Sequence, residues 1–156
     1  MELFQMELFQ VDGAGQLFIS PAISDWQVLV RYRVDTIIDL EGELDSGVPT
    51  VPNECLYIYF PIVDEELPNL HKLHAISALG ASLVRSGHRV LSHCGMGFNR
   101  SALVAGLILN ELGMPGPEIV KRLRERRPGA LFNECFASYV ESLSKPEMTP
   151  SWIDSK

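Results

Sequence analysis

The chain has 156 residues, of which 46% are hydrophobic, and this is enough for one domain with a hydrophobic core. Its formal net charge of −7 argues against non-specific binding of nucleic acids, which needs a basic surface. The three cysteines lack the spacing of a zinc site or a disulfide scaffold, so we expect no metal, no cofactor and a reducing, cytoplasmic location. No run of about 18 apolar residues and no signal peptide is recognisable, so we expect no membrane span.

The chain opens on a short repeat. The pentapeptide MELFQ at residues 1–5 recurs at residues 6–10, and two copies of five residues are too short for a solenoid. We interpret residues 1–10 as a duplicated leader whose second copy leads into the first strand. The sequence DGAG at residues 12–15 then predicts a turn.

Hydrophobic periodicity and breaker residues divide the rest of the chain into strands and helices. Runs rich in β-branched and aromatic residues predict strands at residues 16–20, 34–40, 55–61 and 89–93. Apolar residues at helical spacing predict helices at residues 25–33, 69–86, 100–112, 115–127 and 133–144. This order predicts an α/β fold with a central, mostly parallel sheet of about four to five strands flanked by helices. We expect one domain over residues 1–156, ending in a polar tail at residues 145–156.

A loop after the strand at residues 89–93 carries the predicted chemistry. It lies at the carboxyl end of a strand and feeds a helix, which is where α/β proteins bind ligands. Its backbone N–H groups can form an anion-binding nest, and the helix end adds a partial positive charge. The residues of this predicted phosphate-binding loop are Gly95, Met96, Gly97, Phe98 and Asn99, followed by Arg100.

The side chains around this loop have predicted roles. Cys94 is the candidate nucleophile, because the nest and the helix end would stabilise its thiolate. Arg100 supplies a planar fork for two phosphoryl oxygens, and Ser101 can donate a hydrogen bond that helps the sulfur leave. We expect His93 to orient the loop through hydrogen bonds. An inert buried cysteine with an incidental arginine is the alternative, which the joint placement of these residues disfavours.

The pattern His93-Cys94-x-x-Gly97-x-x-Arg100-Ser101 matches the signature of the protein tyrosine phosphatases and resembles their dual-specificity branch. The resemblance covers residues 16–143, and it includes YIYFPIVD at residues 57–64, which is similar to the general-acid loop of that family. It implies a dual-specificity phosphatase-like fold. It also implies metal-independent hydrolysis of phosphomonoesters, on phosphotyrosine and on phosphoserine or phosphothreonine of proteins, through a cysteinyl phosphate. Phosphate, sulfate or vanadate would be the active-site anions.

The resemblance also assigns supporting residues. Asp64, which lies 30 residues before Cys94, would be the general acid, with Glu65 and Glu66 as alternatives. The other interpretation of Asp64 is a solvated loop carboxylate. Asn133 is predicted to cap its helix, and the resemblance implies that it also hydrogen-bonds the loop around Cys94.

The remaining polar residues and cysteines are interpreted mainly as structural or solvent-exposed. Asp39 ends a strand and is interpreted as structural. The basic residues at positions 121–127 predict a solvated helix face, with a docking site for acidic or phosphorylated partners as the alternative. Cys55 and Cys135 are interpreted as core or supporting residues, either of which could form a disulfide with Cys94 on oxidation.

Other functions of the same fold stay open at this point. GFNR at residues 97–100 resembles the metal-independent RNA 5′-triphosphatases, which the acidic charge and Asp64 disfavour. Phosphoinositide phosphatases usually carry lysines inside the loop, whereas residues 95–99 are uncharged. A phosphopeptide-binding module would be expected to lose Cys94 or Arg100, and a rhodanese-like sulfur transferase would not need the pair Arg100-Ser101.

Overall fold

The structure is a computed structural model that describes residues 6–146 and contains one five-stranded sheet with the order β1-β2-β5-β3-β4. Only β1 is antiparallel to its neighbour, and the other pairs are parallel, so the predicted mostly parallel sheet is confirmed. The predictions for residues 1–5 and 147–156 lie outside the described residues. The strands are β1 (Phe9–Gln10), β2 (Leu17–Ser20), β3 (Thr36–Asp39), β4 (Leu56–Tyr59) and β5 (Val90–His93).

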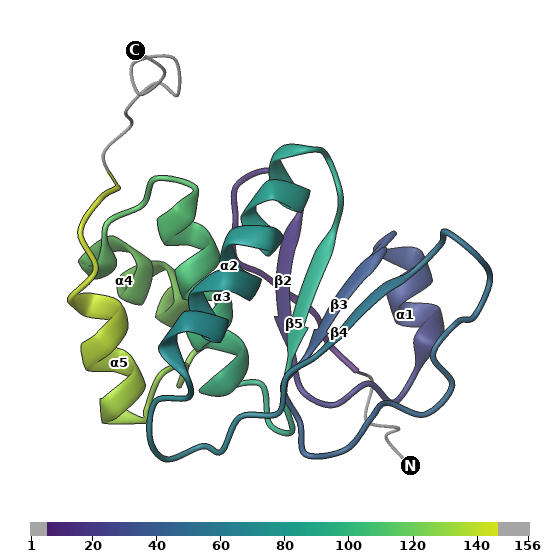
Figure 1. The fold of residues 1–156 in the computed structure, drawn as a ribbon, viewed down its shortest axis with the longest axis horizontal. Helices are drawn as coiled ribbons and strands as arrows, with labels where there is room; N and C mark the ends of the chain where they lie inside the picture. Colours follow the sequence, from purple (N-terminus) through teal and green to yellow (C-terminus); the bar gives the residue numbers. More distant parts are fainter. Residues whose placement is uncertain (1–5, 147–156) are drawn as a thin grey trace.

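The sheet separates two unequal layers of helices (Figure 1). Among the described helices, only α1 (Trp26–Arg31) covers one face, over a small core that includes Phe18 and Leu91. The other face carries the larger core. Its helices are α2 (Leu70–Arg85), α3 (Arg100–Glu111), α4 (Gly116–Arg126) and α5 (Glu134–Glu141).

Three of the described helices begin at residues whose side chains cap them. The side chains of Asp25, Asn69 and Asn133 each accept a backbone N–H at the start of α1, α2 and α5. Helix α3 is buried along residues 101–109 because it lies between the sheet and the other helices of its layer. All predicted helices and strands are present, although most are a few residues shorter than predicted. The second MELFQ copy contributes β1, which pairs with β2.

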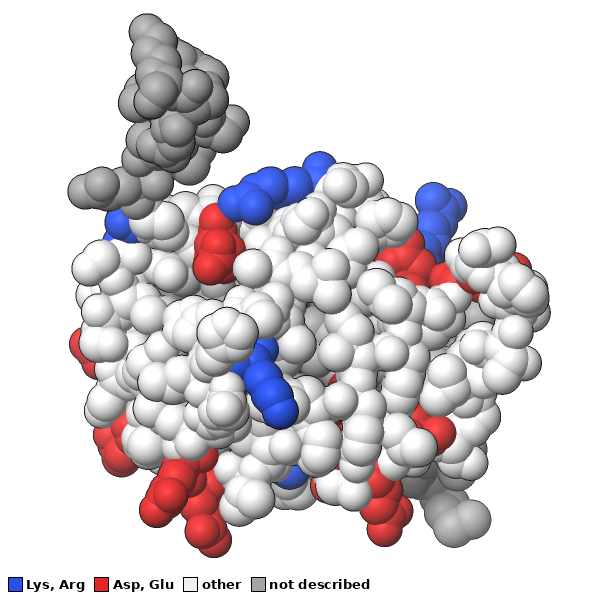
Figure 2. Space-filling model, viewed as in Figure 1, with Lys and Arg blue, Asp and Glu red and all other residues white. Residues whose placement is uncertain are grey.

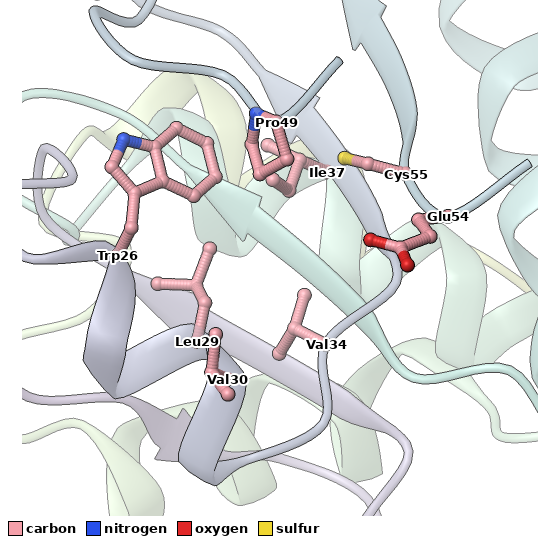
Figure 3. Close-up of a pocket in the computed structure, with 8 residues that line it drawn as sticks. All are labelled: Trp26, Leu29, Val30, Val34, Ile37, Pro49, Glu54 and Cys55. Atoms are coloured by element: carbon pink, nitrogen blue, oxygen red, sulfur yellow. The ribbon is translucent and has the colours of Figure 1, made fainter. Parts of the chain in front are cut away.

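A pocket of about 120 Å³ lies on the α1 face of the sheet, away from the larger core (Figure 3). The indole N–H of Trp26 donates to the carbonyl of Ser46 at 2.8 Å and so ties α1 to the loop that closes this pocket. Its lining is mainly apolar, and consists of Trp26, Leu29, Val30, Val34, Ile37, Pro49, Glu54 and Cys55. None of the helices within residues 6–146 has both the length and the apolar character needed to cross a bilayer.

Candidate active site

The predicted phosphate-binding loop leaves the carboxyl end of the central strand. In the sheet register, His93 at the end of β5 lies between Ser20 of β2 and Asp39 of β3. The residues that follow these three strand ends therefore converge on one edge of the sheet. Helix α3 begins at Arg100, directly after the loop, so its amino end faces the same space.

Cys94 lies at the bottom of this loop, with 1% of its surface exposed. Its Sγ accepts a hydrogen bond from the backbone N–H of Gly97 at 3.2 Å and lies 3.4 Å from Oγ of Ser101. Donors aimed at sulfur stabilise a thiolate more than a neutral thiol. The structure thus brings together the candidate nucleophile, the loop amide and the hydroxyl that the sequence predicts to assist it.

Arg100 is held at the edge of the loop. Its Nη1 donates to the carbonyl of Ile62 at 3.3 Å, and its Nη2 lies 3.7 Å from Oε2 of Glu41. Its Nε is buried and makes no hydrogen bond within the described residues. A planar guanidinium anchored at its far end in this way can offer its remaining N–H groups to an anion. Glu41 follows β3, and no pattern in its sequence neighbourhood marks it as a partner of Arg100.

Asp64 is bound to the loop and to the start of α5 through two asparagines. The side-chain amide of Asn99 donates to its Oδ2 at 2.9 Å, and that of Asn133 donates to its Oδ1 at 2.9 Å. The backbone N–H of Asn133 in turn donates to Oδ1 of Asn99 at 2.9 Å. Asn99 precedes α3 but does not cap it with its side chain, because that side chain bonds to Asp64 and to the backbone N–H of Asn133. The three predicted residues therefore form one connected network.

His93 is fully buried beneath the loop and contacts two carboxylates. Its Nε2 lies 2.6 Å from Oδ2 of Asp45 and 3.6 Å from Oδ1 of Asp39, and the Tyr57 hydroxyl donates to Asp39. Burial raises the pKa of Asp45, and burial together with the bond to Asp39 raises the pKa of Tyr57. Asp39, Asp45 and His93 are close enough to share a metal ion, but the His93–Asp45 contact has the length of a hydrogen bond. The role of His93 in orienting the loop stays a prediction, and no pattern in the sequence marks Asp45 as its partner.

The outer side of the loop is covered by the segment that joins α4 to α5. Arg127 donates to the carbonyls of Met96 and Gly97, and the backbone N–H of Leu131 donates to the carbonyl of Phe98. Arg122 and Arg124 likewise donate to backbone carbonyls of the fold. Arg122 and Arg127 are partly buried, so the prediction of a solvated basic face is wrong for these two, whereas Arg124 is exposed.

The strand register excludes a disulfide between Cys55 and Cys94. Leu56 is aligned with Thr36, and Thr36 with Val90, so Cys55 and Cys94 are five positions apart along the strand direction. At about 3.3 Å per residue this offset is roughly 16 Å, whereas disulfides need Cα atoms within about 7 Å. All three cysteines are free thiols, and Cys135 is exposed at the start of α5.

Comparison with known proteins gives one consistent fold. No family model matches the chain. The protein phosphatase Slingshot homolog of Xenopus laevis is 26% identical over 158 residues, which cover 94% of this chain and 22% of that protein. The crystal structure of a variant of human DUSP28 matches with a TM-score of 0.73 and 25% identity, over 86% of this chain and 93% of that one. The chain is therefore similar, in sequence and in fold, to dual-specificity phosphatases of the protein tyrosine phosphatase superfamily.

The fold is shared by a protein that is named as phosphatase-like and interacting, not as a phosphatase. The human tyrosine phosphatase-like serine/threonine/tyrosine-interacting protein also matches, with a TM-score of 0.69 and 20% identity over 86% of this chain and 93% of that one. At this identity the likeness concerns the fold alone. The chain spans about a fifth of the length of its curated Slingshot relative. The fold therefore leaves the activity to be argued from the residues of the site.

Proposed function

We propose that this chain is a cysteine-dependent phosphatase that hydrolyses phosphomonoesters on phosphotyrosine and on phosphoserine or phosphothreonine of proteins. The observation that carries the proposal is the surroundings of Cys94. Its buried sulfur accepts the N–H of Gly97, lies beside the hydroxyl of Ser101 and sits at the amino end of α3, which begins with Arg100. These groups favour a thiolate and a bound oxyanion at the same place.

The first step would be transfer of the phosphoryl group to sulfur. The Cys94 thiolate attacks phosphorus, the bond from phosphorus to the leaving oxygen breaks, and protonated Asp64 gives its proton to that oxygen. Arg100 and the N–H groups of residues 95–99 stabilise the three equatorial oxygens, on which charge is spread in the transition state. The products are a free alcohol or phenol, a cysteinyl phosphate and an Asp64 carboxylate.

The second step would be hydrolysis of the cysteinyl phosphate. The Asp64 carboxylate takes a proton from a water molecule, whose oxygen attacks phosphorus while the bond from sulfur to phosphorus breaks. The Ser101 hydroxyl stabilises the departing thiolate at the distance already present. Inorganic phosphate leaves, and both Cys94 and Asp64 return to their starting forms. The network with Asn99 and Asn133 supports this role, because it ties Asp64 to the loop.

The surface of the molecule supports monophosphate over polyanionic substrates. Figure 2 shows acidic side chains gathered along the lower edge, at the end of the sheet from which the loop emerges in Figure 1. Glu41 and Asp64 contact loop residues directly. Triphosphate and polyphosphoinositide substrates would meet this negative charge with one arginine and an uncharged loop. A phosphorylated protein segment fits better, and phosphate, sulfate or vanadate would occupy the same place.

The compartment and the extent of the domain form part of the same proposal. A catalytic thiolate needs a reducing compartment, so we place the protein in the cytoplasm. We treat residues 1–156 as a single phosphatase domain.

The decisive test is phosphate release from para-nitrophenyl phosphate in the presence of EDTA. We expect activity for the wild type, loss of at least about 1,000-fold for Cys94→Ser, and a large loss for Asp64→Asn on substrates with poor leaving groups. An inactive wild-type protein that still binds a phosphopeptide would instead identify a phosphopeptide-binding module. Full activity of Cys94→Ser would disprove the nucleophile assignment.

A further inference from the structure

Three consecutive carbonyl groups of the phosphate-binding loop are hydrogen-bonded on the outside of the loop. Arg127 donates from Nη2 to the carbonyl of Met96 at 3.2 Å and from Nε to that of Gly97 at 3.4 Å. The backbone N–H of Leu131 donates to the carbonyl of Phe98 at 2.9 Å. All three bonds come from the segment that follows α4.

These outer bonds determine where the loop N–H groups point. In a planar trans peptide the C=O and the N–H point in opposite directions, so a carbonyl held outside directs the next N–H inside. The peptide between Met96 and Gly97 has this arrangement: its carbonyl accepts from Arg127, while its N–H donates to Sγ of Cys94 at 3.2 Å. The same logic directs the N–H groups of Phe98 and Asn99 toward the space where a phosphoryl group would bind.

The guanidinium of Arg127 is itself held between two aromatic rings. Its Cζ lies 4.4 Å from the ring centroid of Phe9 on β1 and 3.9 Å from that of Phe98 in the loop. Both rings lie against the guanidinium, while its Nε and Nη2 donate to the loop carbonyls. Phe98 also packs against Phe132, with 5.9 Å between ring centroids. Arg127 thus connects β1 to the phosphate-binding loop through contacts with one aromatic ring on each.

We propose that Arg127 is a positioning residue for the phosphate-binding loop and that Phe9 completes the clamp that holds it. The proposal rests on the proposed phosphatase function, because it concerns how the same loop binds phosphate. Arg127 holds the two carbonyls with two different nitrogens, Nε and Nη2, in a fixed planar geometry. A lysine at this position keeps the charge but has a single nitrogen and no flat face to stack.

The clamp predicts a specific pattern in anion binding. Without Arg127, the Met96 and Gly97 peptides lose their outer partner and can rotate, so fewer N–H groups converge on phosphate. Removing one preorganised donor outright costs about 100- to 1,000-fold in rate, and misorienting two of them should cost at least about tenfold. The loss should appear in the affinity for inorganic phosphate, because the N–H groups also bind the product anion.

The experiment compares Arg127→Met, Arg127→Lys and Phe9→Leu with the wild type, and uses Arg126→Met as the matched control. Arg126 is the neighbouring exposed arginine of α4. The measurements are kcat and KM for para-nitrophenyl phosphate, the inhibition constant of inorganic phosphate, and the melting temperature. For Arg127→Met we expect kcat/KM to fall and the phosphate inhibition constant to rise, each by about tenfold or more. Arg127→Lys should recover only part of this loss, Phe9→Leu should lose several-fold, and Arg126→Met should match the wild type.

Clear outcomes would overturn the clamp. A phosphate inhibition constant for Arg127→Met within twofold of the wild type would do so, and so would full recovery by Arg127→Lys, which would leave charge alone as the cause. If Arg127→Met does not fold, Arg127→Lys and Phe9→Leu decide by the same two criteria. If the wild type releases no phosphate, the proposed function fails. Calorimetric binding of inorganic phosphate then still tests the clamp, since equal binding by wild type and Arg127→Lys would refute it.

Discussion

Replacing Gly97 by alanine adds a methyl group where the phosphate-binding loop touches the segment between β2 and α1. Gly97 has a φ of +77°, and a Cβ built on it would lie 2.7 Å from the backbone nitrogen of Pro21 and 2.8 Å from the carbonyl carbon of Ser20. The left-handed backbone costs an alanine about 1–2 kcal/mol. The overlap involves backbone atoms that cannot rotate away, and such overpacking costs about 1–3 kcal/mol.

The two contributions predict a loss of about 3 kcal/mol in the free energy of unfolding. In a domain of this size that corresponds to a fall of roughly 6–12 °C in Tm. Activity should fall by more than about tenfold, since a displacement of about 1 Å in a catalytic loop can cost roughly 100-fold. Thermal unfolding and kcat/KM for para-nitrophenyl phosphate measure the two effects separately.

Gly113→Ala is the matched control for Gly97→Ala. Gly113 has a φ of +109°, and a Cβ built on it would meet nothing within 4 Å. This variant should show the backbone cost of about 1–2 kcal/mol alone, with wild-type activity. If Gly97→Ala melts at the same temperature as Gly113→Ala and keeps full kcat/KM, the argument from close approach is wrong.

Three further substitutions or measurements test other parts of the structure. Asn99→Ala should lower kcat for phenyl phosphate by about tenfold and kcat for para-nitrophenyl phosphate by less. The reason is that the Asn99 amide holds Asp64, the candidate acid, which a poor leaving group needs. Equal losses on both substrates would contradict this. Burial and the charge of Asp35 raise the pKa of Cys55, so at pH 8 mass spectrometry should find Cys55 alkylated by iodoacetamide more slowly than exposed Cys135, and comparable rates would refute the shift. Burial raises the pKa of Asp45 above 3.8, so the stability it contributes is complete below that pH and declines as the pH rises. Urea unfolding should show the wild type losing stability relative to Asp45→Asn as the pH rises above 3.8, and a constant difference would argue against it.

Much of the site could be predicted because its signals are local. The strand before Cys94, the glycines after it and the helix from Arg100 follow from patterns within one or two turns or strand lengths. The caps of α2 and α5 were likewise recognisable, since Asn69 and Asn133 bond to N–H groups three residues away. The resemblance to a known signature added Asp64, which residue chemistry alone left open as a solvated carboxylate.

Other partners were missed because they come from distant parts of the chain. The sequence predicts Arg127 to lie on a solvated helix face, yet its guanidinium packs against Phe9 and Phe98 and donates to two loop carbonyls. Asp45 lies on a loop with no distinguishing pattern, yet it is the hydrogen-bond partner of buried His93. Long-range pairs of this kind depend on the packing of whole elements, and a periodicity or capping rule contains no information about it.

The sequence by itself therefore determined the α/β class, the position of every described helix and of every described strand except β1, and the loop with Cys94 and Arg100. These features depend on residue type, spacing and capping within short segments. Only the tertiary structure decided which residues support that loop. The strand order β2-β5-β3 and the packing of α4 and α5 against α3 bring residues 9, 41, 45, 64, 127 and 133 to one end of the sheet. Convergence of this kind arises from burying two faces of one sheet at once, which is a property of the whole chain and not of any segment.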